Sequence, residues 1–447
     1  MTMTKRTLAA MLMMASGTAA AGGYQLMEQN ASGLGLAYAG AAAAAEDAST
    51  VFFNPAGMTR LPGRQAVVAG HLIVPSARFS NTASTAAAGG FTTGPNGGDA
   101  GDPVFIPNFY LTWALAPQWT AGIGVSVPFG LTTDYDANWV GRFHALRSSL
   151  KTLNVNPSLA YKVNDAVSIG AGVNWQRADA ELTKAVNYSF IAAGTGVGGV
   201  AAGTEGTNRI IGHDDAWGYN LGLMLEPTAR TRIGITYRSA IRYTLQGTVA
   251  YANRPAALDA SFGGNTAAFN QAGDSPVTAA LKVPASASIA VKHSLNAQWD
   301  VLADLTWTQW TAFQSLVVVR SNGFALENSP QNWRDTWRAG LGAQYRTGGA
   351  WTFRGGVAYD QSPVPDAYRT PRIPDQDRIW VAFGGQYRVS KAGAFDFGYA
   401  HIFVKDPQIN MSGPPVITAA QAQGRGSLVG TFDNRIDIVS LQYRHSF

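Results

Sequence analysis

The stretch WRAGLGAQYR, residues 337–346, alternates apolar and polar side chains along its length. Side chains alternate between the two faces of a β-strand, so this stretch predicts a strand with one apolar and one polar face. The apolar face begins and ends with an aromatic ring, and aromatic girdles at both interfaces are typical of strands that cross a membrane within a barrel. That face carries Trp337, Ala339, Leu341, Ala343 and Tyr345.

The same alternation recurs from residue 65 to the end of the chain, for example at 219–225 and 233–237. A soluble β-sandwich would alternate too, but its apolar faces would not so often end in tryptophan or tyrosine. The last predicted strand runs through Val439 and Tyr443 to the C-terminal Phe447. A terminal aromatic residue with lipid-facing parity resembles the signal read by barrel-insertion machinery, although any strand can end in phenylalanine by chance.

The connections between the predicted strands are of two kinds, and short and long ones alternate along the chain. Outer-membrane barrels have short periplasmic turns and long extracellular loops. About seven long and six short connections imply roughly 14 strands, an even number as such barrels require. The short connections lie at 114–118, 162–165, 226–230, 296–298, 346–349 and 390–393. The long ones lie at 80–104, 130–145, 187–212, 251–277, 314–332, 361–377 and 405–427.

The N-terminal residues do not follow the barrel pattern. Lys5 and Arg6, a short apolar run and the small residues 19–21 occur in the order of a secretory signal peptide, so we expect residues 1–21 to be removed. Residues 22–64 are rich in alanine and glycine. Their scattered large apolar side chains favour a compact hatch inside the barrel over a disordered periplasmic extension. The sequence thus predicts an all-β protein, with a transmembrane antiparallel β-barrel at 65–447.

The composition excludes several classes of function. A net charge of +5 on 447 residues is too small to argue for nucleic-acid binding, so we expect no nucleic acid partner. The chain has no cysteine, and its histidines stand in no zinc spacing and no nucleophile motif. We therefore expect no metal, no cofactor and no enzymatic activity. Charged residues make up only 14 % of the chain, against roughly 25 % in an average soluble protein, which suits a surface that largely faces lipid.

Several segments resemble the FadL family of outer-membrane long-chain fatty acid transporters, which also includes channels for aromatic hydrocarbons. Each segment is short, but the ordered set spans the chain. The resemblance implies a barrel of roughly 14 strands, plugged by an N-terminal hatch, in the outer membrane of a Gram-negative bacterium. The segments are GYQL at 23–26, ASGLG at 31–35, AYAG at 37–40, NPA at 54–56, SPVP at 362–365 and IPDQDRIW at 373–380.

The resemblance also implies where a hydrophobic ligand would first bind. The long loops at 187–212 and 251–277 would form an outer hydrophobic groove. Phe190, Phe262 and Phe269 would contribute to it, and ordinary packing within the loops is the alternative interpretation.

Deeper in the barrel, the carboxylate of a fatty acid needs a cation. Lys184 has lumen-facing parity and, by resemblance, falls at a basic position that holds this carboxylate; ordinary polarity of the wall would also explain it. The family's second basic ligand is expected within 325–332, where this chain has no basic residue. Arg334 is then the substitute, unless the ligand here does not need two cations.

The turn Asn54-Pro55-Ala56 bears on gating. Asn-Pro favours turn initiation, and the resemblance makes this motif a key point of the hatch. A stiff turn is useful where a plug must shift as a unit, so the two interpretations are compatible.

A second motif, Pro128-Phe129-Gly130, interrupts the alternating strand at 120–127. Proline donates no ladder hydrogen bond and glycine permits a kink. The resemblance implies that the wall opens sideways at this kink, whereas the simpler interpretation is that Pro128 ends the strand at a loop.

The function that follows is passive, ligand-gated diffusion of long-chain fatty acids, with capture by the extracellular loops and lateral exit through the wall. An uptake channel for aromatic or other neutral hydrocarbons is the close alternative, and an adhesin or structural barrel is a more distant one. The expected surroundings are outer-membrane lipid and lipopolysaccharide, and the expected state is a monomer. The sequence leaves the choice of substrate open.

Overall fold

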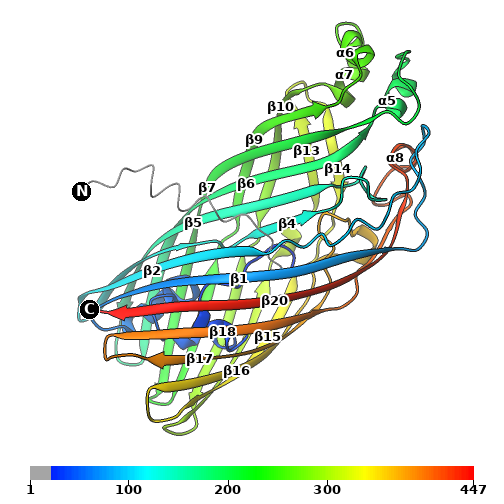
Figure 1. Ribbon diagram of the computed structural model, residues 1–447. Coiled ribbons are helices and arrows are strands. Elements are labelled where there is room, and N and C mark those ends of the chain that lie inside the picture. Colours follow the sequence, from blue (N-terminus) through cyan, green and yellow to red (C-terminus); the bar gives the residue numbers. More distant parts are fainter. Residues whose placement is uncertain (1–21) are drawn as a thin grey trace.

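The computed structural model describes residues 22–447, and the predicted signal peptide at 1–21 lies outside the described residues. Long antiparallel strands close into a barrel of 14 strands, which confirms the predicted fold class (Figure 1). The barrel closes at β1 (Arg64–Asn81), which pairs with β20 (Leu428–Ser446) on one side and with β2 (Val104–Ala116) on the other.

Several positions in the wall are formed by two shorter strands in line. β3 and β4 are one such pair, since both bond to β5, and β8 and β9 are another, since both bond to β7. The strands after β2 are β3 (Trp119–Ser126), β4 (Gly130–Asp134), β5 (Arg147–Lys162), β6 (Val167–Asn187), β7 (Glu205–Thr228), β8 (Thr231–Arg238), β9 (Ile241–Ala252), β10 (Ser275–Val283), β11 (Ser286–Ser294), β12 (Trp299–Thr308), β13 (Ser315–Arg320), β14 (Ala325–Pro330), β15 (Thr336–Arg346), β16 (Trp351–Asp360), β17 (Arg378–Arg388), β18 (Gly393–Val404) and β19 (Gln408–Met411).

The two faces of the strands differ as the alternation predicts. In β15, Trp337 and Leu341 are 49 % and 64 % exposed on the outside of the barrel, whereas Arg338 and Gln344 are buried inside it. Apolar side chains therefore face the lipid, and charged and amide side chains face the lumen, where they must pair with one another.

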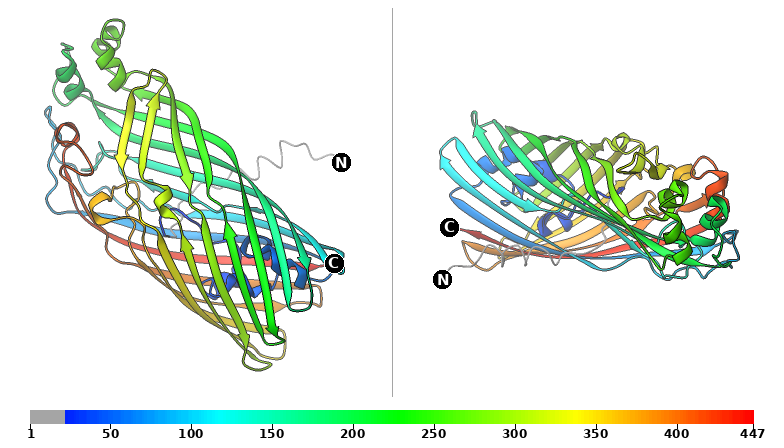
Figure 2. Two further views of the ribbon diagram at one scale, coloured as in Figure 1. Left: turned by 180° about the vertical axis from the view of Figure 1, so that it is seen from behind. Right: turned by 90° about the horizontal axis from the view of Figure 1, so that it is seen from above.

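The connections are short at one end of the barrel and long at the other (Figures 1 and 2). Four of the predicted long loops are wrong in extent. The stretch 130–145 begins with the strand β4, and the stretch 405–427 contains the strand β19. The stretch 314–332 contains the hairpin of β13 and β14, because its run of valines favours a strand. The loop predicted at 187–212 ends earlier, since β7 begins at Glu205. The loops carry the helices α5 (Tyr188–Thr195), α6 (Ala256–Ser261), α7 (Thr266–Ala272), η2 (Trp310–Ala312), η3 (Asp366–Tyr368) and α8 (Ala419–Arg425).

Residues 22–63, called the N-terminal segment below, lie inside the barrel (Figure 2). The segment forms the short helices α2 (Ala31–Leu34), α3 (Ala41–Ala44), α4 (Thr50–Phe53) and η1 (Pro55–Arg60). Helix α2 contacts β17, β18 and β20, and helix α3 contacts β8 and β11. Glycines on the wall permit this close approach, since a Cβ on Gly356 would lie 2.0 Å from the Leu36 carbonyl oxygen. Within residues 22–447, no helix is both long and apolar enough to cross a membrane.

Candidate substrate path

An apolar cavity of about 110 Å³ lies inside the barrel, next to the break between β3 and β4. Its polar lining is confined to Ser148, Ser149, Gln331, Thr370 and Arg372. The remaining lining is almost entirely carbon and includes Tyr24, Leu131, Leu150, Leu182, Ile210, Leu245, Val277, Leu281, Phe313, Leu316, Val318 and Ile373. A mostly apolar pocket with a few convergent polar groups suits a ligand with a long tail and a small head.

Arg372 is the one guanidinium that lines this cavity. It lies in the connection between β16 and β17, and its Nη atoms donate to Ser148 Oγ at 2.9 Å and to the carbonyl of His144 at 3.0 Å. It forms no ion pair with a carboxylate in the part of the chain that the structure describes. A cation with only neutral hydrogen-bond partners therefore stands at the edge of the cavity.

A cluster of charged side chains adjoins the cavity beyond Leu182. Lys184 Nζ lies 2.6 Å from Glu327 Oε2, and Arg425 lies 3.6 Å from the same oxygen. Lys184 has the predicted lumen-facing orientation, but it is paired with Glu327 and does not line the cavity. The buried His144 lies beside this cluster, and burial together with the Arg425 charge lowers the pKa of His144 to about 3, so its imidazole is neutral.

Arg334 lies apart from the cavity lining. Its main-chain N–H donates to the carbonyl of Pro363, and its Nε donates to the carbonyl of Ser362 at 3.4 Å. The structure therefore does not bring Arg334 together with Lys184.

Two of the three predicted loop phenylalanines meet. The rings of Phe262 and Phe269 are 5.6 Å apart, edge to face, and Phe262 packs against an apolar cluster that includes Tyr188, Ile191 and Leu258. Phe190 instead packs against Gly424 of helix α8, where an added Cβ would lie 2.8 Å from its ring.

The predicted break at Pro128-Phe129-Gly130 is present. β3 ends at Ser126, β4 begins at Gly130, and β4 pairs with β5 but, among the described strands, not with β2. At the break, the N-terminal segment lies where a neighbouring strand would otherwise pair, on the side away from β5. The N–H of Leu26 donates to the Pro128 carbonyl at 2.8 Å, and the N–H of Gly130 donates to the Tyr24 carbonyl at 2.9 Å.

Tyr24 is enclosed by aromatic rings at this point. Its ring centroid is 4.7 Å from Trp310, 5.5 Å from Trp333, 5.8 Å from Phe313 and 6.1 Å from Phe129. The preceding residue has a φ of 68°, and a Cβ there would lie 2.8 Å from Trp333, so only glycine fits at Gly23.

Asn54 joins the N-terminal segment to the wall. Its Nδ2 donates to the carbonyl of Ala42 at 2.7 Å and to that of Leu223 in β7 at 3.1 Å. Its Oδ1 accepts from the N–H of Ala56 at 3.1 Å, which caps η1 with Pro55 at its first position. The predicted Asn-Pro turn is thus confirmed as the start of a short helix.

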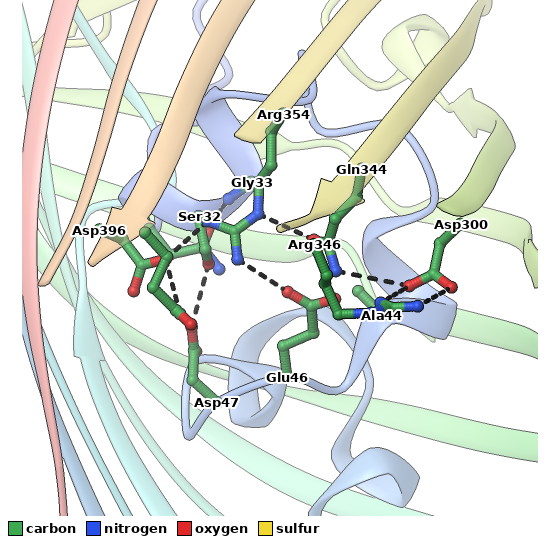
Figure 3. A network of polar contacts seen from close by, with 12 residues as sticks. Ser32, Gly33, Ala44, Glu46, Asp47, Asp300, Gln344, Arg346, Arg354 and Asp396 are labelled. Atoms are coloured by element: carbon green, nitrogen blue, oxygen red, sulfur yellow. Dashed lines mark hydrogen bonds and ion pairs between the residues drawn. The ribbon is translucent and has the colours of Figure 1, made fainter. Parts of the chain in front are cut away.

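Acidic residues of the N-terminal segment face basic residues of the wall (Figure 3). Arg354 of β16 donates to Glu46 at 3.0 Å and to Asp396 at 2.6 Å, and Lys292 of β11 also pairs with Glu46. Burial opposes ionisation of Glu46, but Lys292 and Arg354 outweigh it and hold the pKa of Glu46 below its usual value. These ion pairs attach the segment firmly on the side away from the cavity.

Glu28 contrasts with Glu46. It is fully buried and neither of its carboxyl oxygens has a hydrogen-bond partner. Burial raises the pKa of Glu28 to about 7, against the opposing charges of Arg378 and Arg338. Unlike Glu46, Glu28 therefore forms no ion pair that attaches its part of the segment to the wall, within the residues that the structure describes.

Sequence reasoning missed three residues of this path. Tyr24 lies in the GYQL segment, but its contact with the break joins residues about a hundred positions apart in the chain, so no local pattern indicates it. Arg372 directly precedes the quoted stretch 373–380, which is the only sign of its importance. Glu327 carries no sequence signal, because its pairing with Lys184 depends on how the barrel closes.

Comparisons with known proteins agree with this architecture. A family model described as outer membrane protein transport protein (OMPP1/FadL/TodX) matches residues 12–447. The long-chain fatty acid transport protein of Escherichia coli K12 is 28 % identical over 452 residues, covering 96 % of this chain and 97 % of the relative.

Solved structures show the same fold. A Pseudomonas aeruginosa FadL homologue superposes with a TM-score of 0.86 at 28 % identity and covers 95 % of this chain and 100 % of its own. The Ralstonia pickettii toluene transporter TbuX gives a TM-score of 0.64 at 21 % identity, with 94 % of this chain and 98 % of that chain covered. At the lower identity the likeness concerns the fold alone.

Proposed function

The chain belongs to the outer-membrane transport protein family OMPP1/FadL/TodX, and from this premise we propose that it carries long-chain fatty acids by passive, ligand-gated diffusion. Members of the family are transport channels and not enzymes. The chain is accordingly an outer-membrane transporter of fatty acids or hydrophobic aromatic compounds, located in the outer membrane of a Gram-negative bacterium.

One observation carries the proposal: an apolar cavity inside the barrel has Arg372 at its edge and Tyr24 in its wall. A fatty acid has one anionic head and one apolar tail, so its head would lie at Arg372 and its tail along the apolar lining. The relative from Escherichia coli is a long-chain fatty acid transport protein, which supports the same substrate class.

Release of the ligand is the difficult step. Each buried CH₂ contributes about 0.8 kcal/mol, so a tail of about 16 carbons gains on the order of 12 kcal/mol before other costs. We propose that Phe262 and Phe269, with Phe190 nearby, capture the ligand from outside, and that the cavity holds it next. Discharge then needs a part of the wall or the plug to move.

The exit that we propose is the break at Pro128-Phe129-Gly130. There the wall is completed by residues 24–26 and not by a barrel strand. If ligand in the cavity displaces Tyr24, the segment leaves the break and the ligand passes sideways into the bilayer, where its tail stays in hydrocarbon. The turn Asn54-Pro55-Ala56 would hold the remainder of the hatch in place while this part moves.

A neutral hydrocarbon is the alternative ligand. The observation that favours it is the pairing of Lys184 with Glu327, because the expected cation already has a carboxylate partner. Arg334 does not supply a second cation, since it lies elsewhere.

The surroundings of the barrel complete the proposal. Phe447 is 75 % exposed at the end of β20, where barrel-insertion machinery could bind it. Outer-membrane lipid and lipopolysaccharide would contact the apolar exterior. The barrel closes on itself and residues 24–26 bond to the wall at the break, so no second copy is needed to cover a strand edge and we expect a monomer.

The test is uptake of labelled oleate and labelled toluene by cells that have or lack this protein. Protein-dependent uptake of oleate supports the proposal. Uptake of toluene alone would assign the neutral-hydrocarbon function, and uptake of neither would refute transport of both classes.

A further inference from the structure

Glu327 places a carboxylate beside the cavity that is proposed to hold the ligand. It lies directly opposite Val318 in the β13–β14 hairpin, and Val318 lines the cavity. Residues directly opposite in an antiparallel pair have Cβ atoms about 4.5–5.5 Å apart on one face of the sheet. Lys184 follows the cavity residue Leu182 on the same face of β6.

Positive charges outnumber negative charges around Glu327. Lys184 at 2.6 Å and Arg425 at 3.6 Å share the same carboxyl oxygen, and the charge of Arg372 also acts on Glu327. The side chains of Lys184 and Glu327 are only 12 % and 8 % exposed, so solvent screens the pair weakly. The cluster is built to hold a carboxylate, and the carboxylate that it holds belongs to the protein.

We propose that Glu327 is a specificity-determining residue: it occupies the cationic cluster that would otherwise bind an anionic head group, and thereby lowers the affinity of the cavity for carboxylates relative to uncharged ligands with the same tail. The inference rests on the proposed function, since it concerns the same cavity. A carboxylate head group at Arg372 would be attracted by Arg372, Lys184 and Arg425. It would be repelled by Glu327. The repulsion weakens carboxylate binding and so favours release of a ligand whose tail alone binds tightly.

Glu327→Gln tests the proposal with two ligands that differ only in head charge, oleate and methyl oleate. Glutamine keeps the shape of the side chain and still accepts a hydrogen bond from Lys184. We expect oleate to bind on the order of ten- to a hundredfold more tightly, the effect of removing one unit charge about 6–12 Å away at an effective dielectric constant near 20. Binding of methyl oleate should stay within about twofold, because an uncharged head does not respond to the change.

Two more variants test whether oleate affinity follows the sign of the charge that is removed. They are Lys184→Gln and the double variant that combines Lys184→Gln with Glu327→Gln. Lys184→Gln should weaken oleate binding by a similar factor, and the double variant, which removes one charge of each sign, should return to the wild-type affinity. The control is Glu181→Gln on the same strand, which removes the same charge from an exposed pair with Arg209 and should change neither ligand.

Binding is measured on purified, heat-modifiable barrels, so that a folding defect is recognised before titration. If Glu327→Gln fails to fold, the double variant, which removes one charge of each sign, is compared with Lys184→Gln instead, and tighter oleate binding by the double variant supports the proposal. Equal changes for oleate and methyl oleate, or weaker oleate binding by Glu327→Gln, would overturn it and make the pair purely structural. If the wild-type protein binds neither oleate nor methyl oleate, the proposed function itself is refuted.

Discussion

The main-chain N–H of Leu26 donates a hydrogen bond to the carbonyl of Pro128 at 2.8 Å, and so joins the N-terminal segment to the broken strand of the wall. On its other side β4 has its regular neighbour, β5. The segment therefore substitutes for a missing stretch of wall with only two main-chain hydrogen bonds, whereas β1 and β20 pair over seventeen residues, from 65 to 81. The break is therefore bridged by far fewer main-chain hydrogen bonds than the seam between β1 and β20.

Substitution of Gly130 tests whether the break is the exit. An added Cβ would point at Leu26, 3.0 Å from its Cδ1, with no other atom closer than 3.8 Å. We expect Gly130→Val to abolish oleate uptake, because its branches would fill the gap that remains after the segment withdraws, and Gly130→Ala to have a smaller effect. The barrel should stay folded and heat-modifiable. If a surface-exposed valine variant took up oleate at the wild-type rate, the ligand would have to leave through the periplasmic end.

Removal of the Asn54 side chain tests the anchorage of the hatch. Asn54→Ala leaves the carbonyls of Ala42 and Leu223 without their donor, at a cost of roughly 1–3 kcal/mol for each buried group. We expect lower oleate uptake with an intact barrel, because the strand ladder is untouched. Thr59→Ala removes hydrogen bonds to Ser168 and to the Ala56 carbonyl but keeps the hydrogen bonds of Asn54, so it is the matched control and should transport normally. Wild-type uptake by Asn54→Ala would show that this turn has no part in gating.

Glu28 should make the attachment of the N-terminal segment depend on pH. The pKa of buried Glu28 is raised to about 7 from an ordinary value of 4.5. As pH rises from 4.5 to 7, Glu28 loses its proton in the locally opened state but keeps it in the buried state. The buried state is therefore stabilised at pH 5 and loses that stability by pH 8, by on the order of a few kcal/mol.

Amide hydrogen exchange of residues 24–30 measures this effect directly. After correction for intrinsic rates, wild-type amides should open more readily at pH 8 than at pH 5. Glu28→Gln cannot ionise, so it should slow exchange at pH 8 and make protection nearly independent of pH. A wild-type opening free energy that is the same at both pH values would contradict the account of Glu28.

The wall could be predicted from the sequence because its pattern is local. The alternation at 337–346 sets which side chains face lipid, and the strand count follows from the alternation of short and long connections. At 314–332 the sequence predicts a loop instead of the hairpin, because glycine, asparagine and proline surround the short strands there. The interruption after Ser126 was predicted from proline and glycine alone.

The interior could not be predicted in the same way. Lys184 was placed in the lumen correctly from its parity, but its partner Glu327 is 143 positions away and meets it only through the closed barrel. The contact of Leu26 with Pro128 likewise depends on how the N-terminal segment folds inside the wall. Parity fixes the face of a side chain, whereas pairing across the lumen depends on the whole barrel.

A reversible disulfide across the break tests the central claim most directly. Gln25 and Phe129 form a non-hydrogen-bonded antiparallel pair, whose Cα atoms lie about 4.5 Å apart, and this is within the range that a disulfide spans. The chain has no cysteine of its own, so Gln25→Cys with Phe129→Cys introduces a single possible bridge. Oleate uptake is measured before and after reduction, with each single cysteine variant as the control. We predict that the oxidised double variant does not take up oleate and that reduction restores uptake; uptake by the fully cross-linked protein at the rate of its reduced form would contradict exit through this break.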